Sequence, residues 1–336
     1  MILITGAAGY IGSHTAINFI QNGCDIVIFD NLEVGHIEIV NELKKLGNVE
    51  FEQGDLRNLE DINRVFDKYS IDGVIHFAAF ALVGESVTNP SKYYRNNVYG
   101  TLNLLDAMVA HDVKKIVFSS TCATYGEPKY TPIDEEHPQS PINPYGNSKL
   151  CVEYMLKDYD TAYGLKSIRL RYFNVAGCDE QTRVGEWHDT ETHLIPNILK
   201  SVCEENKTFK IFGDDYDTPD GTCIRDYVNV EDLAQAHRLA YLYLCENNKS
   251  DVFNLGTEQG DSVKEVFNTC EKVLNKKISV ETVERRAGDP AKLYADATKA
   301  KSILKWSPER TLEKSITTAY NWERKLNKMK AGKQWQ

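Results

Sequence analysis

The first twenty residues contain an apolar segment, a glycine-rich turn and a helical pattern, in that order. Residues 1–5 (MILIT) are almost entirely apolar, as in a strand that is buried on both faces. The turn that follows carries Gly6, Gly9 and Gly12, and residues 13–20 have helical periodicity. Backbone N–H groups and the helix dipole at such a turn face an anion. The segment therefore predicts a pyrophosphate site, with a tight turn that binds nothing as the alternative.

Further strand patterns alternate with helical ones as far as residue 171. We expect strands at about 24–30, 49–56, 73–79, 115–120 and 166–171, and one helix over about 90–110. This alternation predicts an α/β fold, a Rossmann-type doubly wound parallel sheet with helices on both faces. Ligands of such sheets bind at the carboxyl ends of the strands. The residues at those ends are Gly6, Asp30, Asp55, Ala78, Thr121 and Phe173.

Two carboxylates at strand ends indicate which dinucleotide would bind. Asp30 ends the second strand, 18 residues beyond Gly12. A carboxylate there accepts hydrogen bonds from a ribose diol and repels a 2′-phosphate, which favours NAD over NADP. Asp55 follows the third strand and is placed to meet an adenine edge. His76 lies within the fourth strand, where a packed core histidine is the better interpretation.

A second helix start carries the candidate chemistry. Asn143 is a good N-cap and Pro144 a good first helical residue. Tyr145 and Lys149 then lie four residues apart, on one face of the helix. An ammonium group beside a phenol favours the phenolate, so this pair predicts a general base. The alternative is a chance YxxxK on an exposed helix.

The pattern changes after residue 176. Helical stretches at about 193–206, 231–246, 262–276 and 311–328 alternate with short strands and polar loops. We interpret residues 1–176 as a dinucleotide-binding domain and residues 177–336 as a smaller mixed α/β cap that binds the substrate. The acidic run at residues 214–217 is interpreted as a solvated loop, and the basic residues 324–333 as a solvated helix end.

Composition excludes several classes of partner. A net charge of −10 argues against nucleic acid or an anionic membrane surface. The chain has no apolar run of 18 residues, and it opens directly on a strand pattern. The eight cysteines are scattered without metal-ligand spacing, which indicates free thiols in a reducing compartment and no metal site. We therefore expect a cytoplasmic protein.

The motifs together resemble those of a known family. The chain is similar to the extended short-chain dehydrogenase/reductases, and among them to the UDP-glucose 4-epimerases. The resemblance covers nearly the whole length and is carried by TGAAGYIGSHT, FDNL, GDLRN, HFAAFALVGES, NNVYGT, FSSTCATYG, NPYGNSK, RYFNVAG, THLIPN, RDYVNVEDLA, FNLGT and RRAGDPAKLYAD. Some members of the family carry a Lys after the fourth strand, where Ala81 stands here, and the loop at residues 32–35 departs from the family's pattern, so no cofactor contacts are assigned to it.

The resemblance implies roles for individual residues. Tyr145 would be the acid/base, Lys149 would tune it and hold the nicotinamide ribose, and Thr121 would hydrogen-bond the reacting sugar oxygen. The residues implied to bind NAD are Gly6, Gly9, Tyr10, Ile11, Gly12, Asp30, Asn31, Asp55, Leu56, Phe77, Ala78, Ala79, Asn96, Lys149 and Phe173. Those implied to bind a UDP-sugar are Thr121, Tyr145, Asn174, His193, Leu194, Phe212, Arg225, Arg286, Asp289 and Leu293.

The implied reaction is the interconversion of UDP-galactose and UDP-glucose through a 4-keto sugar, with NAD retained and a homodimer as the assembly. Leu293 would border the substituent at C2, which implies weaker activity on UDP-N-acetylglucosamine and UDP-N-acetylgalactosamine. A 4,6-dehydratase needs an Asp-Glu pair after the catalytic Thr, where Cys122 and Ala123 stand. A UDP-glucuronate epimerase or decarboxylase, a sugar reductase and a non-catalytic NAD-sensing protein stay open as alternatives.

Overall fold

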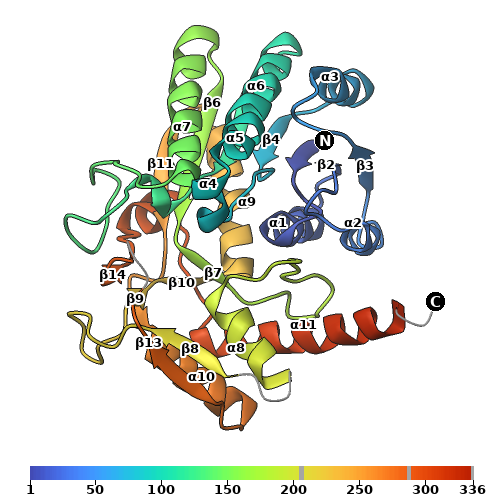
Figure 1. The fold of residues 1–336 in the computed structure, drawn as a ribbon. Helices are drawn as coiled ribbons and strands as arrows, with labels where there is room; N and C mark the ends of the chain where they lie inside the picture. Colours follow the sequence, from blue (N-terminus) through green and yellow to red (C-terminus); the bar gives the residue numbers. More distant parts are fainter. Residues whose placement is uncertain (204–207, 286–288, 334–336) are drawn as a thin grey trace.

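The apolar segments near the N-terminus form one seven-stranded parallel sheet. In the computed structural model, which describes residues 1–203, 208–285 and 289–333, the strand order is β11-β6-β5-β4-β1-β2-β3. Its strands are β1 (Ile2–Thr5), β2 (Ile26–Asp30), β3 (Val49–Gln53), β4 (Gly73–His76), β5 (Lys115–Ser119), β6 (Lys166–Tyr172) and β11 (Asp251–Leu255). The predicted doubly wound architecture is confirmed, and Figure 1 shows the sheet with its helices in the upper part of the view.

Alternate strand residues supply two separate cores. Ile2 and Ile4 of β1 belong to one buried cluster and Leu3, between them, to the other. The first cluster includes α1 (Tyr10–Gln21), α2 (Ile37–Leu43) and α9 (Val230–Asn247). The second includes α3 (Leu59–Lys68), α6 (Gly100–Ala110) and α7 (Pro144–Tyr163). Strands that bury both faces need apolar residues at every position, which is why these segments read as continuous apolar runs.

The single helix expected over residues 90–110 is divided. After α4 (Val83–Thr88), the chain forms α5 (Pro90–Tyr93), a π-helical segment η1 (Tyr94–Tyr99) and then α6. The side chain of Asn97, within η1, donates to the carbonyl of Phe80 (3.0 Å) and accepts from its N–H (2.9 Å). The same amide donates to Ser148 Oγ (3.1 Å), which ties the loop after β4 to α7.

The predicted start of α7 is confirmed in detail. Asn143 is the N-cap and accepts a 2.8 Å hydrogen bond from the N–H of Gly146, and Pro144 is the first helical residue. The helix ends at Gly164, whose φ of +67° lies in the left-handed region that favours glycine. Both ends are therefore fixed by local sequence, which holds Tyr145 in the first turn.

A smaller lobe lies below the sheet in Figure 1 and is built from short strands and four helical segments. Three small sheets pair β7 with β10, β9 with both β12 and β14, and β8 with β13. The elements are β7 (Asn174–Ala176), α8 (Leu194–Cys203), β8 (Phe209–Phe212), β9 (Ile224–Arg225), β10 (Tyr227–Asn229), β12 (Asp261–Ser262), α10 (Val263–Leu274), β13 (Val280–Val283), β14 (Lys292–Leu293), η3 (Ala300–Leu304) and α11 (Leu312–Lys333).

The seven-stranded sheet includes a strand from beyond residue 176, so it crosses the domain boundary expected there. Both α9 and β11 come from the C-terminal half, yet β11 pairs in parallel with β6 and α9 packs beside α1 and β6. The sequence pattern changes at residue 177, but the chain returns to the sheet before completing the smaller lobe. In the basic end of α11, Arg324, Lys328 and Lys330 are exposed as expected, whereas Leu326 among them is buried.

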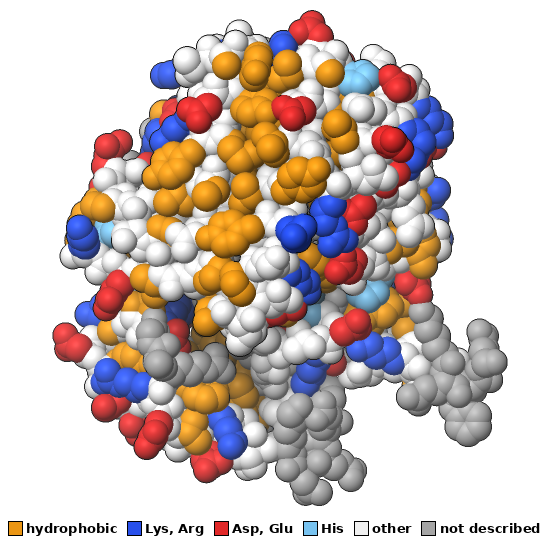
Figure 2. Space-filling model, turned by 45° about the horizontal axis from the view of Figure 1, so that its top comes forward, with side chains coloured by type: hydrophobic (Ala, Val, Ile, Leu, Met, Phe, Trp, Pro, Cys, Tyr) orange, Lys and Arg blue, Asp and Glu red, His pale blue; other side chains and the backbone are white. Residues whose placement is uncertain are grey.

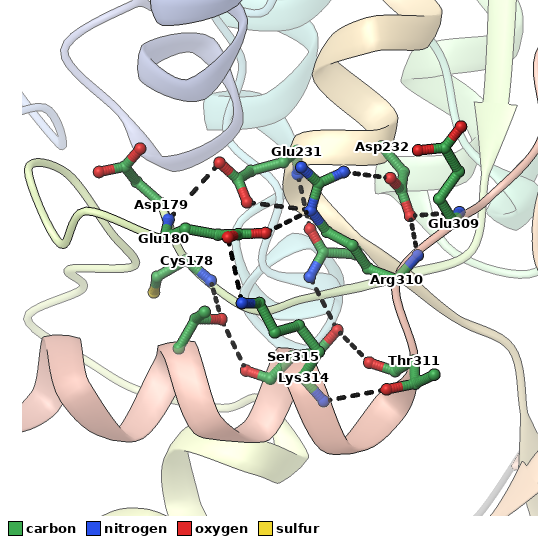
Figure 3. A network of polar contacts seen from close by, with 12 residues as sticks. Cys178, Asp179, Glu180, Glu231, Asp232, Glu309, Arg310, Thr311, Lys314 and Ser315 are labelled. Atoms are coloured by element: carbon green, nitrogen blue, oxygen red, sulfur yellow. Dashed lines mark hydrogen bonds and ion pairs between the residues drawn. The ribbon is translucent and has the colours of Figure 1, made fainter.

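A polar network joins the segment after β7 to the starts of α9 and α11 (Figure 3). Arg310 lies at its centre, with NH1 2.5 Å from Asp232 Oδ1 and Nε 3.1 Å from Glu231 Oε2. The same Nε lies 3.2 Å from Glu180 Oε1, and Lys314 Nζ reaches the other oxygen of Glu180 at 3.1 Å. Several linked charges of this kind hold the two lobes together better than isolated surface pairs would. Among the residues described, none of the helices is long and apolar enough to cross a membrane.

Candidate active site

Thr121, Tyr145 and Lys149 converge where β5 ends. Thr121 follows β5 and caps the short helix η2 (Cys122–Thr124), where its Oγ1 accepts a 3.1 Å hydrogen bond from the N–H of Ala123. A hydrogen bond between Thr121 and Tyr145 acts on the phenol and favours its ionised form. The structure therefore brings together the three residues for which the sequence predicted catalytic roles.

Lys149 is buried one turn further along α7. Its Nζ donates to the carbonyl of Ser119 at 2.8 Å and lies 4.9 Å from the ring centroid of Phe118. The same atom is 6.0 Å from the centroid of the Tyr145 ring. Burial lowers the pKa of Lys149 to about 7, because an ammonium group loses hydration there.

The protein alone does not make Tyr145 a base near neutrality, which corrects the sequence expectation. Burial raises the pKa of Tyr145 to about 12, and the hydrogen bond from Thr121 opposes that rise only in part. Lys149 makes its hydrogen bond with a carbonyl oxygen and not with the phenol. Desolvation of the phenolate is therefore the dominant influence on the pKa of Tyr145 in the protein alone.

The glycine-rich turn has the shape that a dinucleotide pyrophosphate requires. Gly6 has a φ of +76°, and a Cβ there would lie 2.6 Å from the backbone nitrogen of Ala78. A Cβ on Gly12 would lie 2.4 Å from the carbonyl oxygen of Gly6. Both positions therefore admit only glycine, while Gly9 is the N-cap of α1 and lacks a side-chain cap. The N–H groups at the start of α1 are available to an anion, so these residues fit the group.

Asp30 and Asp55 follow neighbouring strands. Asp30 is buried and accepts from the N–H of Ala8 (3.0 Å) and the N–H of Leu32 (2.9 Å). Burial raises the pKa of Asp30, and these two hydrogen bonds oppose the rise. Asp55 is paired with Arg57, which lowers the pKa of Asp55 to about 2, and it accepts from Asn31 Nδ2 at 3.0 Å. The two carboxylates and Asn31 thus lie together just after the carboxyl ends of β2 and β3.

The other residues predicted to line NAD lie around the same strand ends. Tyr10 and Ile11 open α1, with Tyr10 donating a 2.5 Å hydrogen bond to the carbonyl of Gly177. Leu56 follows β3 and is buried. Asn96 lies within η1 and donates to Asn97 Oδ1 at 3.0 Å. The segment after β4 supplies Phe77, Ala78 and Ala79, all partly buried, and Phe173 follows β6.

Three of the residues predicted to bind the UDP-sugar, Arg225, Asp289 and Leu293, lie together around β9 and β14. These strands pair in parallel so that Leu293 is the register partner of Arg225. Arg225 NH1 donates to the carbonyl of Pro290 at 2.8 Å, and its NH2 lies 3.3 Å from Asp289 Oδ1. Leu293 packs against the buried cluster that contains Cys122, Tyr125, Ile133, Phe173 and Ala295. This cluster connects the sugar residues to the segment just after Thr121. Arg286 lies outside the described residues.

Four further predicted residues lie elsewhere in the smaller lobe. Asn174 begins β7 and donates its N–H to the carbonyl of Asp226 at 2.9 Å, while Phe212 ends β8. Leu194 begins α8. His193 precedes it, half exposed, with Nδ1 2.9 Å from Glu186 Oε1 and 2.8 Å from Glu191 Oε1. Burial would lower the pKa of His193, but the two carboxylates raise it to about 10.

A buried ion pair next to the catalytic residues was missed by the sequence analysis. Glu153 lies one turn beyond Lys149, and both of its oxygens pair with Arg171 of β6, at 2.9 and 2.5 Å. Ser120 Oγ donates to Glu153 Oε1 at 2.6 Å, and Arg171 NH1 donates to Tyr125 Oη at 2.9 Å. The spacing of four from Lys149 placed Glu153 on the same helix face, which was a usable signal.

A stacked pair of rings was also missed. His36, just before α2, stacks on Trp187 with centroids 3.8 Å apart and rings 12° from parallel. The ring of His36 also makes a 3.1 Å hydrogen bond with the carbonyl of Trp187. The two residues lie 151 positions apart in the chain, so sequence alone gave no signal for the contact.

Comparisons with known proteins agree with this geometry. A family model described as "GDP-mannose 4,6 dehydratase" matches residues 3–319. The UDP-glucose 4-epimerase of Halalkalibacterium halodurans is 49% identical over 96% of this chain and 95% of its own length. The UDP-glucose 4-epimerase of Brucella ovis, solved in complex with NAD, is 45% identical with a TM-score of 0.91, covering 95% of this chain and 97% of that one. The enzyme of Bifidobacterium longum, solved with NAD+ and UDP, is 40% identical with a TM-score of 0.90, covering 96% and 98%.

Proposed function

This chain belongs to the UDP-glucose 4-epimerase family, and we propose that it interconverts UDP-galactose and UDP-glucose through a 4-keto sugar. The observation that carries the proposal is the convergence of Thr121, Tyr145 and Lys149 at the end of β5, at the same edge of the parallel sheet as the glycine-rich turn after β1. A positioned hydroxyl and phenol next to a dinucleotide cradle suit the removal and return of a hydrogen at a sugar carbon.

Each of the three residues has a distinct task. Tyr145 as phenolate accepts the proton of the 4-hydroxyl and later returns it. The hydroxyl of Thr121 makes hydrogen bonds with both the Tyr145 phenol and the reacting sugar oxygen, which keeps these two groups next to each other. Lys149, fixed on the Ser119 carbonyl, supplies positive potential near the phenol and donors for a ribose hydroxyl. Bound NAD supplies the hydride acceptor and a positive charge that adds to that of Lys149.

The smaller lobe supports retention of the cofactor. The segment after β7 contacts α1 through the hydrogen bond between Tyr10 and Gly177, and α2 through the stack of His36 on Trp187. His14 of α1 also bonds with the same segment, through Nε2 and the N–H of Asp179 at 2.9 Å. These three contacts join α1 and the start of α2 to the segment after β7. They would have to break before a dinucleotide bound at the glycine-rich turn could leave. NAD retained through the cycle can take up and return the same hydride.

The smaller lobe also supplies the UDP-sugar residues in this proposal. Arg225 is a planar fork suited to a pyrophosphate, and Asp289 is the acidic partner that orients it. The residues assigned with it are Asn174, His193, Leu194, Phe212, Arg286 and Leu293. We retain the working division into an NAD-binding part, residues 1–176, and a sugar-binding part, residues 177–336, with α9 and β11 as the segment that returns to the sheet.

Other reactions of related enzymes are less well supported. Dehydration at C5–C6 needs an extra acid and base, and Cys122 and Ala123 after Thr121 offer neither; burial raises the pKa of the Cys122 thiol to about 12. A decarboxylase or reductase of the same fold would consume substrate without forming a 4-epimer. A non-catalytic NAD sensor has no need for the Thr121, Tyr145 and Lys149 group. The reaction products therefore discriminate among these alternatives.

We place a homodimer on the face formed by α6 and α7. Apolar side chains gather there in Figure 2, and among the exposed residues of these helices and η1 are Tyr99 (50%), Leu102 (36%) and Tyr154 (51%). A contiguous apolar surface of this kind fits a second copy of the same face in a two-fold dimer. Leu102→Glu should give a monomer in analytical ultracentrifugation, while Val280→Glu, on β13, should leave a dimer. A monomeric wild-type protein would contradict the assignment.

The compartment is also part of the proposal. Among the described cysteines, Cys122, Cys178 and Cys270 are buried and form no disulfide. Free thiols persist where glutathione and thioredoxin keep them reduced. We therefore place the protein in the cytoplasm. Fractionation of cells that produce it natively tests this assignment, and recovery outside the cytoplasm would contradict it.

The deciding experiment uses the purified protein without added cofactor. It is incubated with UDP-galactose, and UDP-glucose formation is followed by chromatography together with NADH absorbance. We expect interconversion to an equilibrium mixture with no stoichiometric NADH. NADH released in proportion to product would indicate an oxidoreductase. A preparation with bound NAD and no turnover of any UDP-hexose would indicate the sensor.

A further inference from the structure

Two histidines and two glutamates cluster in the segment that leads into α8. They are Glu186, His188, Glu191 and His193, spaced at intervals of two, three and two residues. One potential ligand atom from each lies within 4.8 Å of the others. No metal site was predicted from the sequence, in which the cysteines are scattered without metal-ligand spacing and the acidic run at residues 214–217 is typical of a solvated loop. The cluster contains none of the three catalytic residues, but it shares His193 with the residues assigned to the UDP-sugar.

Two of the four distances within the cluster are close to those between ligands of one ion, and two are shorter. His193 Nδ1 lies 2.9 Å from Glu186 Oε1 and 2.8 Å from Glu191 Oε1. His188 Nδ1 lies 3.4 Å from Glu186 Oε1 and 3.6 Å from Glu191 Oε2. Bonds of about 2.0–2.2 Å in a tetrahedral zinc site place neighbouring ligand atoms about 3.4 Å apart. The two distances from His188 are close to that value, whereas the two from His193 are hydrogen-bond lengths and would have to increase to make room for an ion.

One atom of the cluster, the ring nitrogen Nδ1 of His188, lacks a hydrogen-bond partner among the described residues. His188 Nδ1 is buried and has no hydrogen-bond partner among the described residues, although two carboxylates lie near it. The glutamate side chains are themselves only 7% and 5% exposed. A buried ring nitrogen that faces carboxylates without hydrogen-bonding to either needs an explanation. A metal ion between the three groups would satisfy the nitrogen and compensate both carboxylates.

The backbone around the cluster is already fixed. The carbonyl of Glu186 accepts a 2.8 Å hydrogen bond from Trp322 Nε1, a residue of α11. Glu191 Oε1 accepts from the N–H of Thr192 (2.9 Å) and the N–H of His193 (2.8 Å), which orients the carboxylate at the start of α8. Such outer contacts hold metal ligands in place and are characteristic of built sites.

We propose that Glu186, His188, Glu191 and His193 bind a divalent transition metal of the zinc class in a four-coordinate site. Two imidazoles and two carboxylates are a ligand set that suits zinc or cobalt, whereas calcium and magnesium prefer oxygen ligands alone. The ion would fasten the segment between Trp187 and α8. The alternative arrangement is a set of ion pairs between protonated histidines and the carboxylates, with no metal.

The test uses tag-free, cofactor-containing protein from which metals have been removed with a chelator. Titration with Co²⁺ should give the intense visible absorption of a four-coordinate site, saturating at one equivalent. Zn²⁺ should abolish that absorption at one equivalent, and Mg²⁺ should not. Absence of the Co²⁺ spectrum in the wild-type protein would overturn the proposal, whatever the variants do.

Variants locate the site. His188→Gln and Glu191→Gln should each weaken Co²⁺ binding by at least about tenfold. His111→Gln is the matched control, since His111 pairs only loosely with Asp67, at 3.9 Å, in a different part of the fold. Unchanged affinity in both cluster variants, with circular dichroism showing that they are folded, would also overturn the proposal. The spectrum does not depend on turnover, so its failure would leave the proposed epimerase reaction untouched.

Discussion

Lys149 Nζ donates a 2.8 Å hydrogen bond to the carbonyl oxygen of Ser119, the last residue of β5. This bond fixes the ammonium group two residues before Thr121, and it links the helix that carries Tyr145 to the strand that leads to Thr121. Burial lowers the pKa of Lys149 to about 7, so the group changes charge within the working pH range of ordinary assays. The hydrogen bond to Ser119 therefore fixes the position of the ammonium group, while its burial sets the pH at which it loses its charge.

Lys149 should make stability depend on pH. Its pKa falls from 10.5 when unfolded to about 7 when folded, so between these values the unfolded chain binds a proton that the folded one lacks. Stability then rises with pH across this window. From pH 7.5 to pH 9.5, cofactor-stripped wild type should gain about 2 kcal/mol relative to Lys149→Met in urea unfolding. Lys157→Met, at an exposed position of the same helix, is the control. A constant difference between wild type and Lys149→Met would contradict the lowered pKa.

Tyr145→Phe removes the group that handles the proton while keeping the ring. We expect kcat to fall by roughly 10²–10⁴, the usual contribution of a positioned acid or base. NAD content and the unfolding midpoint should stay close to wild type. Tyr154→Phe is the matched control, because Tyr154 lies in the same helix but is 51% exposed. Turnover of Tyr145→Phe comparable to that of the control would remove Tyr145 from the mechanism.

The arrangement of the sheet was predictable because its strands are buried on both faces and leave long apolar runs. The ends of α7 were predictable for the same kind of reason, since Asn143, Pro144 and Gly164 act locally. The return of β11 to the sheet could not be predicted from the sequence. Its pairing with β6 joins residues that are 83 positions apart in the chain, such as Ile168 and Asp251. The pKa of Tyr145 also depends on burial, which sequence spacing alone does not reveal.

Glu153 should be important for stability although it touches no proposed substrate. Burial alone would raise the pKa of Glu153, but Arg171 holds it below its usual range, so the pair is ionised. Glu153→Ala leaves a buried guanidinium unpaired and should cost about 3–5 kcal/mol of unfolding free energy. Asp158→Ala, at an exposed position of the same helix, should cost less than about 0.5 kcal/mol. Equal midpoints for the two variants in urea would show that the buried pair is not structural.

Asp30 should decide between the two dinucleotides. Asp30→Ala removes the acceptor for a ribose diol and should weaken NAD binding by about 10–100-fold, as expected for hydrogen bonds to a charged group. Affinity for NADP should fall less or rise, because the repulsion of a 2′-phosphate is also lost. Calorimetric titration of cofactor-stripped protein measures the affinities for NAD and NADP. Asp25→Ala is the control, because Asp25 is exposed and lies just before β2. Equal wild-type affinity for NAD and NADP would contradict the role of Asp30.

Leu293 should influence which sugars are accepted. It is the register partner of Arg225 and packs against the cluster that contains Cys122 and Phe173, so it lies between the proposed pyrophosphate residue and the catalytic segment. A leucine leaves more room at the sugar C2 position than a tyrosine, but it offers an acetamido group no hydrogen bond. We therefore expect UDP-glucose and UDP-galactose as main substrates, with weaker activity on UDP-N-acetylglucosamine.

Leu293→Tyr should lower kcat/KM for the N-acetylated sugars by at least about tenfold relative to the plain ones, because added bulk at a packed site costs about 1–3 kcal/mol. Leu293→Met conserves volume and is the control, for which the ratio should stay within about twofold. The measurement is kcat/KM for both sugar types in all three proteins. An unchanged ratio in Leu293→Tyr would mean that Leu293 is only a packing residue of β14, and that another part of the smaller lobe sets the selectivity.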